Sequence, residues 1–458
     1  MKSPQSIAVP FTATFNRRML IIGVLVWELV QLLFLIAFTP PLEGAFSIVG
    51  VSSPSNLTFF TFQSLFYHSL ALPLVALLVY VTLETFKVKA RSAKYAEYAI
   101  TVGYGLVSIG GVAQILTGWN PIGRGIFFTG LALSFTAGLA LLVAFNPFRK
   151  GAPQESSSRR DNLPRRVVWV AVLFVLAAVV VGGYASMGSS QWGASGIMEK
   201  FTIIKSSHEH VTVTIIDVAI VALVSEHFGI KRFQGTRGFF ADVGMYSMVI
   251  AVPGVAVSTF AAIPFGVEAH NVITPFSAVL LQGALFVMYA IMADLALKPG
   301  KGNMLRRLLS DPLSFGLLFI FMWVDVAVGL PGIYVAVKLS KFRGSLNEGP
   351  FILGHEHALI VLTAMALLLL TVSLIGIKGF ARNTIGLTAT AGYTVATGAS
   401  VLYIFLDPTA GQSFAMPYIQ VGIILMLVGV LATIVAMVRS LRKGIGGSFQ
   451  RSEGFGTS

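Results

Sequence analysis

The chain has 458 residues, of which 55% are hydrophobic and only 11% are charged, and its mean hydropathy is +0.81. Soluble chains are about 25% charged, so this composition excludes an ordinary soluble protein. The absence of cysteine excludes disulfides, thiolate metal sites, iron–sulfur clusters and covalently attached c-type haem. A metal or cofactor would have to be held by histidine, methionine or oxygen ligands.

Apolar runs of about 20 residues, the length that a transmembrane helix needs, recur from one end of the chain to the other. The amino-terminal stretch MKSPQSIAVPFTATFNRRML has no small-residue cleavage site before a second hydrophobic block, unlike a secretory signal. We therefore expect an all-α polytopic membrane protein that forms one membrane domain over residues 1–458. The twelve expected spans are residues 19–38, 60–83, 97–118, 124–145, 166–187, 206–228, 239–261, 271–295, 313–337, 353–376, 384–405 and 417–438.

The net charge of +13 reflects topology rather than a nucleic-acid partner. With the amino terminus inside, 26 of the 32 Lys and Arg residues fall in the inner segments and six fall outside. Such an excess follows the positive-inside rule. We expect a multi-pass protein of a prokaryotic cell membrane, with both termini in the cytoplasm, the lipid bilayer as its surroundings and no bound nucleic acid.

An internal repeat is the most informative feature of the chain. The stretch HEHVTVTIIDVAIVALVSEHFGIK (208–231) aligns without gaps to HEHALIVLTAMALLLLTVSLIGIK (355–378), and a similar stretch in the first third ends at Lys89. In all three copies a tyrosine follows the terminal lysine by fifteen residues: Tyr104, Tyr246 and Tyr393. The sequence thus predicts three pseudo-symmetric units of four helices each, over residues 18–150, 165–300 and 312–442.

Histidine is rare in this chain, yet five of its seven histidines lie early in the second helix of a unit. All five are expected at one depth, in the outer part of the membrane. Residues at i and i+2 on a helix point about 200° apart, so the two histidines of an H-E-H triplet cannot chelate one metal, but each can face a different neighbouring helix. The five histidines are His68, His208, His210, His355 and His357.

Polar groups inside a membrane are costly and usually functional. Several imidazoles at one level suit axial ligation of haem iron, with one histidine from each of two helices. Nearby aromatic residues, namely Phe62, Phe66, Tyr67 and Phe351, would supply a flat apolar slot. The structural alternative is a set of interfacial histidines that lie beside headgroup water.

Twelve helices in three groups of four, with a histidine on helix two, histidines on helix six and an H-x-H on helix ten, resemble subunit I of the haem–copper oxidase and nitric oxide reductase superfamily. The resemblance covers nearly the whole chain in topology and depends on the histidine pattern in sequence. It implies that His68 and His357 hold a low-spin haem and that His355 holds a second haem. The helix-six histidine, which binds the second metal in that family, corresponds to His208 or His210.

The seventh expected span, 239–261, lacks the His-His pair that binds copper or non-haem iron in that family. We therefore expect no copper site and instead a second six-coordinate haem in the old binuclear position. The resemblance favours pairing His68 with His357, and His210 with His355. Strict repeat register would instead pair His68 with His208, and His210 with His355. Either scheme gives two haems and one spare histidine.

Several acidic residues interrupt the apolar runs. Glu209 and Glu356 lie between paired histidines and would either hydrogen-bond an imidazole of a neighbouring unit or be solvated at the outer helix turn. Asp217, Asp294 and Asp325 lie inside apolar runs, as buried proton-handling groups or as polar residues that serve packing.

Together these features imply a haem b-binding subunit of a respiratory electron-transfer complex, with two haems, that relays electrons between the quinol pool and an external cytochrome or cupredoxin. Its partners would be other subunits of that complex, and the oxidase-like subunits of archaeal cytochrome b complexes are similar in outline. A terminal oxidase or nitric oxide reductase-like catalytic subunit is an alternative, so the sequence leaves open whether the chain is itself a complete enzyme. Two further alternative functions are a non-redox proton-coupled transporter and a cofactor-free membrane anchor.

Overall fold

The computed structural model describes residues 17–37, 59–118, 120–148, 162–194, 198–265, 272–297, 303–338, 348–405 and 408–443. These residues form helices and short connections, and no strand occurs among them. Ten of the described helices are long and apolar enough to cross a membrane. The all-α, multi-pass prediction is therefore confirmed. The expected spans at 19–38 and 384–405 fall on helices whose described residues do not meet that length and hydropathy.

The helices fall into three groups by residue range, following the three ranges of the sequence repeat. The first group is α1 (Arg17–Ala37), α3 (Phe59–Thr85), α4 (Arg91–Thr117) and α5 (Pro121–Phe145). The second is α6 (Leu163–Ala194), α7 (Met198–Phe228), α8 (Gly235–Phe265) and α9 (Ile273–Leu297). A short helix, α10 (Met304–Leu309), precedes the third group, which is α11 (Pro312–Val324), the π-helix η4 (Asp325–Gly329), α12 (Leu330–Val337), α14 (Glu348–Ile375), α15 (Gly379–Phe405) and α16 (Pro408–Lys443).

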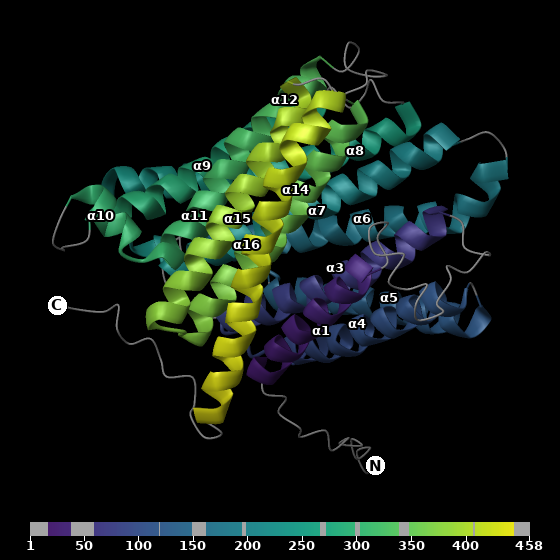
Figure 1. The fold of residues 1–458 in the computed structure, drawn as a ribbon, viewed down its shortest axis with the longest axis horizontal. Coiled ribbons are helices and arrows are strands. Elements are labelled where there is room, and N and C mark those ends of the chain that lie inside the picture. Colours follow the sequence, from purple (N-terminus) through teal and green to yellow (C-terminus); the bar gives the residue numbers. More distant parts are fainter. Residues whose placement is uncertain are drawn as a thin grey trace, which may run out of the picture.

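The helices form one bundle in which the first and last helices meet. Figure 1 shows α1 beginning and α16 ending at the same end of the bundle, with α16 crossing in front of α14 and α15. Contacts between α1 and α16 join the first group to the third.

The second helix of each group lies at the centre. α3, α7 and α14 each contact the other two. In the α7 span 67% of the residues are buried and in the α14 span 61%, against 28% in the spans of α6 and α16, so the outer helices shield α7 and α14 from the surroundings. Residues on the three central helices can therefore meet away from lipid.

The central helices α7 and α14 run parallel and in register. Thr363 donates a hydrogen bond to Asp217 over 2.6 Å, and His227 bonds Ser373 over 3.0 Å at the other end of the same contact. Both pairs are 146 residues apart, which requires two parallel helices at one depth. The expectation that equivalent residues of the second and third groups share a depth is thus met along this contact.

Close glycine contacts join the third and fourth helices of each group. A methyl group added to Gly130 would lie 2.6 Å from the Gly103 carbonyl oxygen, between α4 and α5. The same distance separates such a group on Gly244 from the Gly283 carbonyl, between α8 and α9, and one on Gly392 from the Gly422 carbonyl, between α15 and α16. Small residues of this kind let membrane helices approach backbone to backbone. One packing solution therefore occurs three times.

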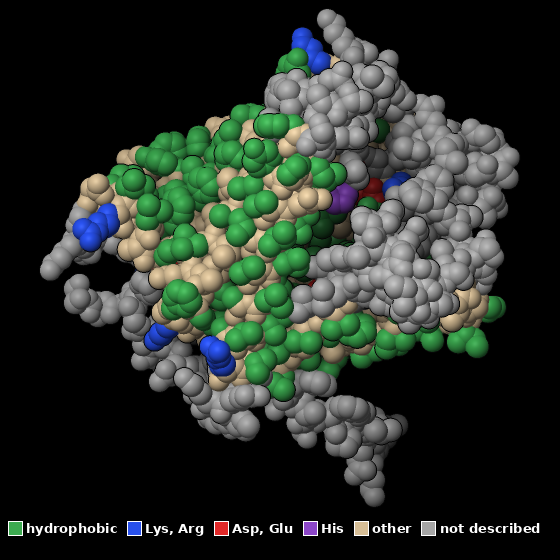
Figure 2. Space-filling view, in the orientation of Figure 1, with side chains coloured by type: hydrophobic (Ala, Val, Ile, Leu, Met, Phe, Trp, Pro, Cys, Tyr) green, Lys and Arg blue, Asp and Glu red, His purple; other side chains and the backbone are tan. Residues whose placement is uncertain are grey.

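The outer surface has the character of a lipid-facing protein. Figure 2 shows a broad hydrophobic face over α9, α15 and α16, with Lys and Arg side chains mostly at its edges. Exposed apolar residues on α16 include Val421, Ile424 and Leu431. Exposed patches of this extent mark an apolar environment or a partner, which supports a position inside a bilayer.

Candidate functional site

The three central helices bring four of the five predicted histidines into two pairs. His68 on α3 faces His208 on α7, with ring centroids 6.2 Å apart and ring planes 16° from parallel. His210, also on α7, faces His355 on α14, with centroids 6.1 Å apart and planes 14° from parallel. The two pairs thus have nearly the same geometry, and α7 contributes one histidine to each.

The i, i+2 spacing explains how α7 serves both pairs. Because the side chains of His208 and His210 leave the helix about 200° apart, one reaches α3 and the other reaches α14. The pairing of His68 with His357 that the resemblance favours is not the one in this structure, where the His68 ring faces the His208 ring. The histidines pair as the repeat alignment predicts. His68 and His210 occupy equivalent positions in the first and second groups, and each faces the first histidine of the H-E-H triplet in the following group.

The spacing of the rings is informative about what could lie between them. Carbon atoms in contact are about 3.5–4.0 Å apart, so rings whose centroids are more than 6 Å apart do not lie flat on each other. Two imidazoles that bind one metal, each through a bond of about 2 Å, have centroids about 6 Å apart once the ring radii are included. Both pairs therefore have the span of two imidazoles on opposite sides of one metal atom.

Backbone carbonyls orient the rings of the first pair. His208 Nδ1 lies 2.7 Å from the Ala178 carbonyl oxygen on α6, and His68 Nδ1 lies 2.7 Å from the Ser64 carbonyl oxygen. A carbonyl can only accept, so each Nδ1 carries the hydrogen and each Nε2 is left with its lone pair. Histidines that bind metals are usually oriented in this way.

The second pair has a related support. The backbone of Val328, in η4, interacts with the His355 imidazole, although His355 Nδ1 makes no hydrogen bond of full geometry. Ala178 lies on α6, which opens the second group, and Val328 lies in η4, which directly continues α11 at the start of the third group. His208 and His355, the first histidines of the two H-E-H triplets, thus each have a backbone carbonyl of an earlier helical segment beside the ring.

A glycine makes room for the ring in both cases. A methyl group on Gly182 would lie 2.7 Å from the His208 ring, and one on Gly332 would lie 2.7 Å from the His355 ring. Both glycines follow the supporting carbonyl by four residues, which places them one turn further along the same helix face. Any larger residue would push the imidazole out of its present position.

The donor set fits haem better than a bare metal ion. Among the described residues, no group of three or more His, Asp or Glu side chains could hold a metal ion, and a structural zinc site needs four protein ligands. Haem iron brings its equatorial nitrogens with it and takes only axial ligands from the protein. Two facing imidazoles from two helices are sufficient for that role.

The middle residues of the triplets converge between the three central helices. The Tyr67 hydroxyl interacts electrostatically with Glu209 and Glu356, and Glu356 interacts with Lys205. Lys205 Nζ also lies 3.6 Å from Glu209 Oε1. The two glutamates therefore share a lysine, which the sequence analysis did not anticipate.

The remaining predicted residues have varied surroundings. His357 is exposed at its position on α14. The Phe351 ring lies 5.5 Å from His355, and Phe127, which the sequence analysis did not single out, lies 6.1 Å from His68 at right angles to it. The side chains of Phe62 and Phe66 lie outside the described residues. Aromatic rings thus flank one imidazole of each pair.

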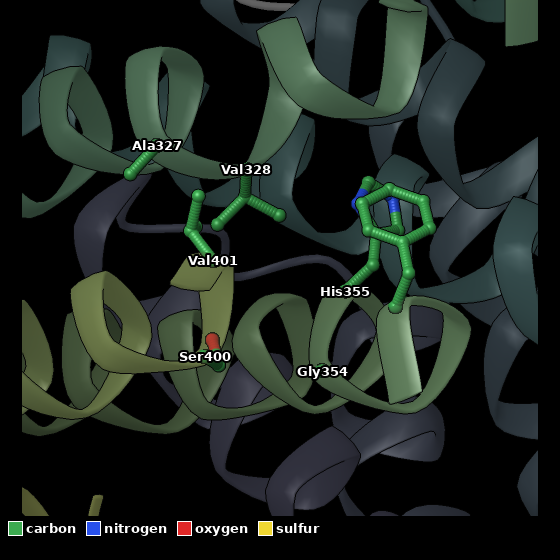
Figure 3. Close-up of a pocket in the computed structure, with 7 residues that line it drawn as sticks. Ala327, Val328, Gly354, His355, Ser400 and Val401 are labelled. Carbon is green, nitrogen blue, oxygen red and sulfur yellow. The ribbon is translucent and has the colours of Figure 1, made fainter. Parts of the chain in front are cut away.

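A small cavity opens beside the second pair. Figure 3 shows His355 with Val328 across the cavity and Gly354, Ser400 and Val401 around it. Its volume of about 10 Å³ is room for about one water molecule. This cavity is too small for an organic ligand, so the two imidazole pairs are the feature that could hold a cofactor.

Comparisons with known proteins give no independent guide. No protein-family model, curated protein or solved structure matches this chain. The function must therefore be argued from the histidine pairs and their surroundings.

Proposed function

We propose that the chain is a haem b-binding subunit of a membrane electron-transfer complex. His68 and His208 would hold one haem, and His210 and His355 would hold the second. The observation that carries the proposal is the duplicated geometry: two nearly parallel imidazole pairs with the span of two axial ligands. Bound there, haem supplies a one-electron carrier. The four histidines would bind the iron, and the carbonyls of Ser64 and Ala178 would orient the imidazoles of the first pair.

The two sites would lie side by side at one depth. His208 and His210 are separated by two residues, which is about 3 Å along a helix axis, and their partners lie on helices that contact α7. Electrons would therefore move within the plane of the membrane rather than across it. With the charge pattern placing the histidines in the outer half, the quinol pool would be the donor or acceptor on one side and an external cytochrome or cupredoxin on the other.

The repeat explains why there would be two sites and not three. The proposal takes the twelve helices as three units of four, an arrangement that the recurring glycine contacts of α4–α5, α8–α9 and α15–α16 support. In this register position 66, which is Phe, is the equivalent of His208 and His355. The first unit would thus have one histidine where the other two units have two.

An electron-transfer role is favoured over oxygen or nitric oxide reduction. The seventh span corresponds to α8, and residues 235–265 contain no histidine, so a second metal would lack its ligands there. Both proposed sites would already have two axial ligands and no open position for a substrate. The chain would act with other subunits of a prokaryotic respiratory complex.

Visible spectroscopy of the protein purified from its native membrane tests this proposal. We expect a dithionite-reduced minus oxidised spectrum with sharp low-spin bands, two haems b per chain, and no change when carbon monoxide is added. A carbon monoxide-sensitive haem would favour the catalytic alternative. A protein that contains no haem would leave the transporter or the anchor and end the proposal.

A further inference from the structure

Two carboxyl groups are buried in the bundle, one of them about two helical turns after His210 on α7. Asp217, on α7, is 8% exposed and Asp325, the first residue of η4, is 5% exposed. The Asp217 Oδ1 atom accepts a hydrogen bond from Thr363 on α14 over 2.6 Å. The Oδ2 atoms of both residues are buried without a hydrogen-bond partner.

Among the described residues, no cation neutralises the pair. Thr363 hydrogen-bonds Asp217, and the charge of Asp217 acts on Asp325. α15 contributes Tyr393, which is fully buried near both carboxyls, but its hydroxyl donates to the Ala358 carbonyl over 3.1 Å. α9 also contacts η4, yet its Asp294 is paired with Arg237.

Two ionised carboxylates in such a place would be very costly. Like charges close together oppose each other's ionisation, and a buried charge without a partner loses its hydration. A cation of the calcium type needs six or more oxygen ligands, more than these side chains supply. A proton removes one charge and gives an orphaned oxygen a donor, so it is the ligand that fits.

The π-helix connects this pair to the histidines. π-turns inside helices occur frequently at functional sites. η4 carries Asp325 at its first position and Val328 at its fourth, and the Val328 backbone interacts with the His355 ring. One five-residue segment therefore carries one member of the carboxyl pair and lies close to an imidazole of the second site.

We propose that Asp217 and Asp325 together form a one-proton binding site whose occupancy is linked to the charge of the group held by His210 and His355. Proton binding stands on the carboxyl geometry, whereas the linkage rests on the proposed function. An electron placed at the second site adds negative charge nearby, which is weakly screened in a protein interior. Reduction would thus favour proton uptake, and by reciprocity a bound proton would favour reduction.

Infrared spectroscopy of the full-length protein tests proton binding without reference to haem. We expect a protonated-carboxyl C=O band at neutral pH that shifts on deuterium exchange. The band should shift in Asp217→Asn and in Asp325→Asn, disappear in the double variant, and stay unchanged in Asp294→Asn. No such band, or a band that survives the double substitution, would overturn the proton site. If the double variant does not fold, the shift in each single variant decides the question.

A redox titration tests the linkage. The midpoint potential of the second site should fall as pH rises through the titration of the pair, by up to about 59 mV for each tenfold change in proton concentration. The slope should be lost in Asp325→Asn. A pH-independent potential beside an intact infrared band would remove the linkage and keep the proton site. The infrared result stands even if no haem is found.

Discussion

Replacing His208 with alanine should lower the haem content from two to one per chain, and His355→Ala should do the same at the other site. Each substitution removes one of two facing imidazoles, and the structure offers no described side chain to replace it. His68→Ala should match His208→Ala, and His210→Ala should match His355→Ala. The double variant His208→Ala/His355→Ala should lose both haems. Haem extraction and quantification per chain is the measurement.

His357→Ala is the matched control for this series. His357 belongs to the same kind of triplet as His210 but is exposed, so its removal should leave two haems. The pairing that the oxidase resemblance implies makes the opposite forecast, since there His68 and His357 share one haem. Loss of a haem in His357→Ala, with both retained in His208→Ala, would show that the register pairing is wrong.

Gly182→Ala and Gly332→Ala should each weaken one site without removing a ligand. The added methyl group would meet the His208 or His355 ring at 2.7 Å, so the ring or the helix must move. Overpacking of this kind costs about 1–3 kcal/mol, and a loss of 1.4 kcal/mol corresponds to about a tenfold weaker affinity. Haem retention during incubation with an excess of a haem-accepting apoprotein measures the effect.

Gly183→Ala gives a close control for this pair. Gly183 is next to Gly182 on the same helix, and a methyl group there meets no atom within 4 Å. It should behave as the unaltered protein does. Equal haem loss in Gly182→Ala and Gly183→Ala would mean that the substitutions act through helix propensity rather than through the imidazole.

The sequence predicted the helical class and the residues of the candidate site because both leave local signals. Apolar runs of span length are visible without any partner, and the triplets stand out because histidine is rare. The partner of His68 was less accessible. The resemblance favoured His357, whereas the repeat register of the sequence contained the pairing with His208 that the structure shows.

Other features depend on contacts between distant parts of the chain. The sequence marks Gly182 and Gly332 only as ordinary glycines in apolar runs, since their role appears once a ring from another helix packs there. The π-turn at Asp325 lies inside the run predicted as one continuous span at 313–337, where an extra residue in a turn leaves no periodic signal. Asp294 resembled Asp217 and Asp325 in sequence but pairs with Arg237, 57 residues away.

Electron paramagnetic resonance of the oxidised protein tests the central claim most directly, because the spectrum of low-spin ferric haem depends on the angle between its two axial imidazole planes. Planes that lie 14° and 16° from parallel predict rhombic low-spin signals that integrate to two spins per chain. High-spin signals, a low-spin signal of the type given by perpendicular imidazoles, or no ferric haem signal would contradict the two bis-histidine sites.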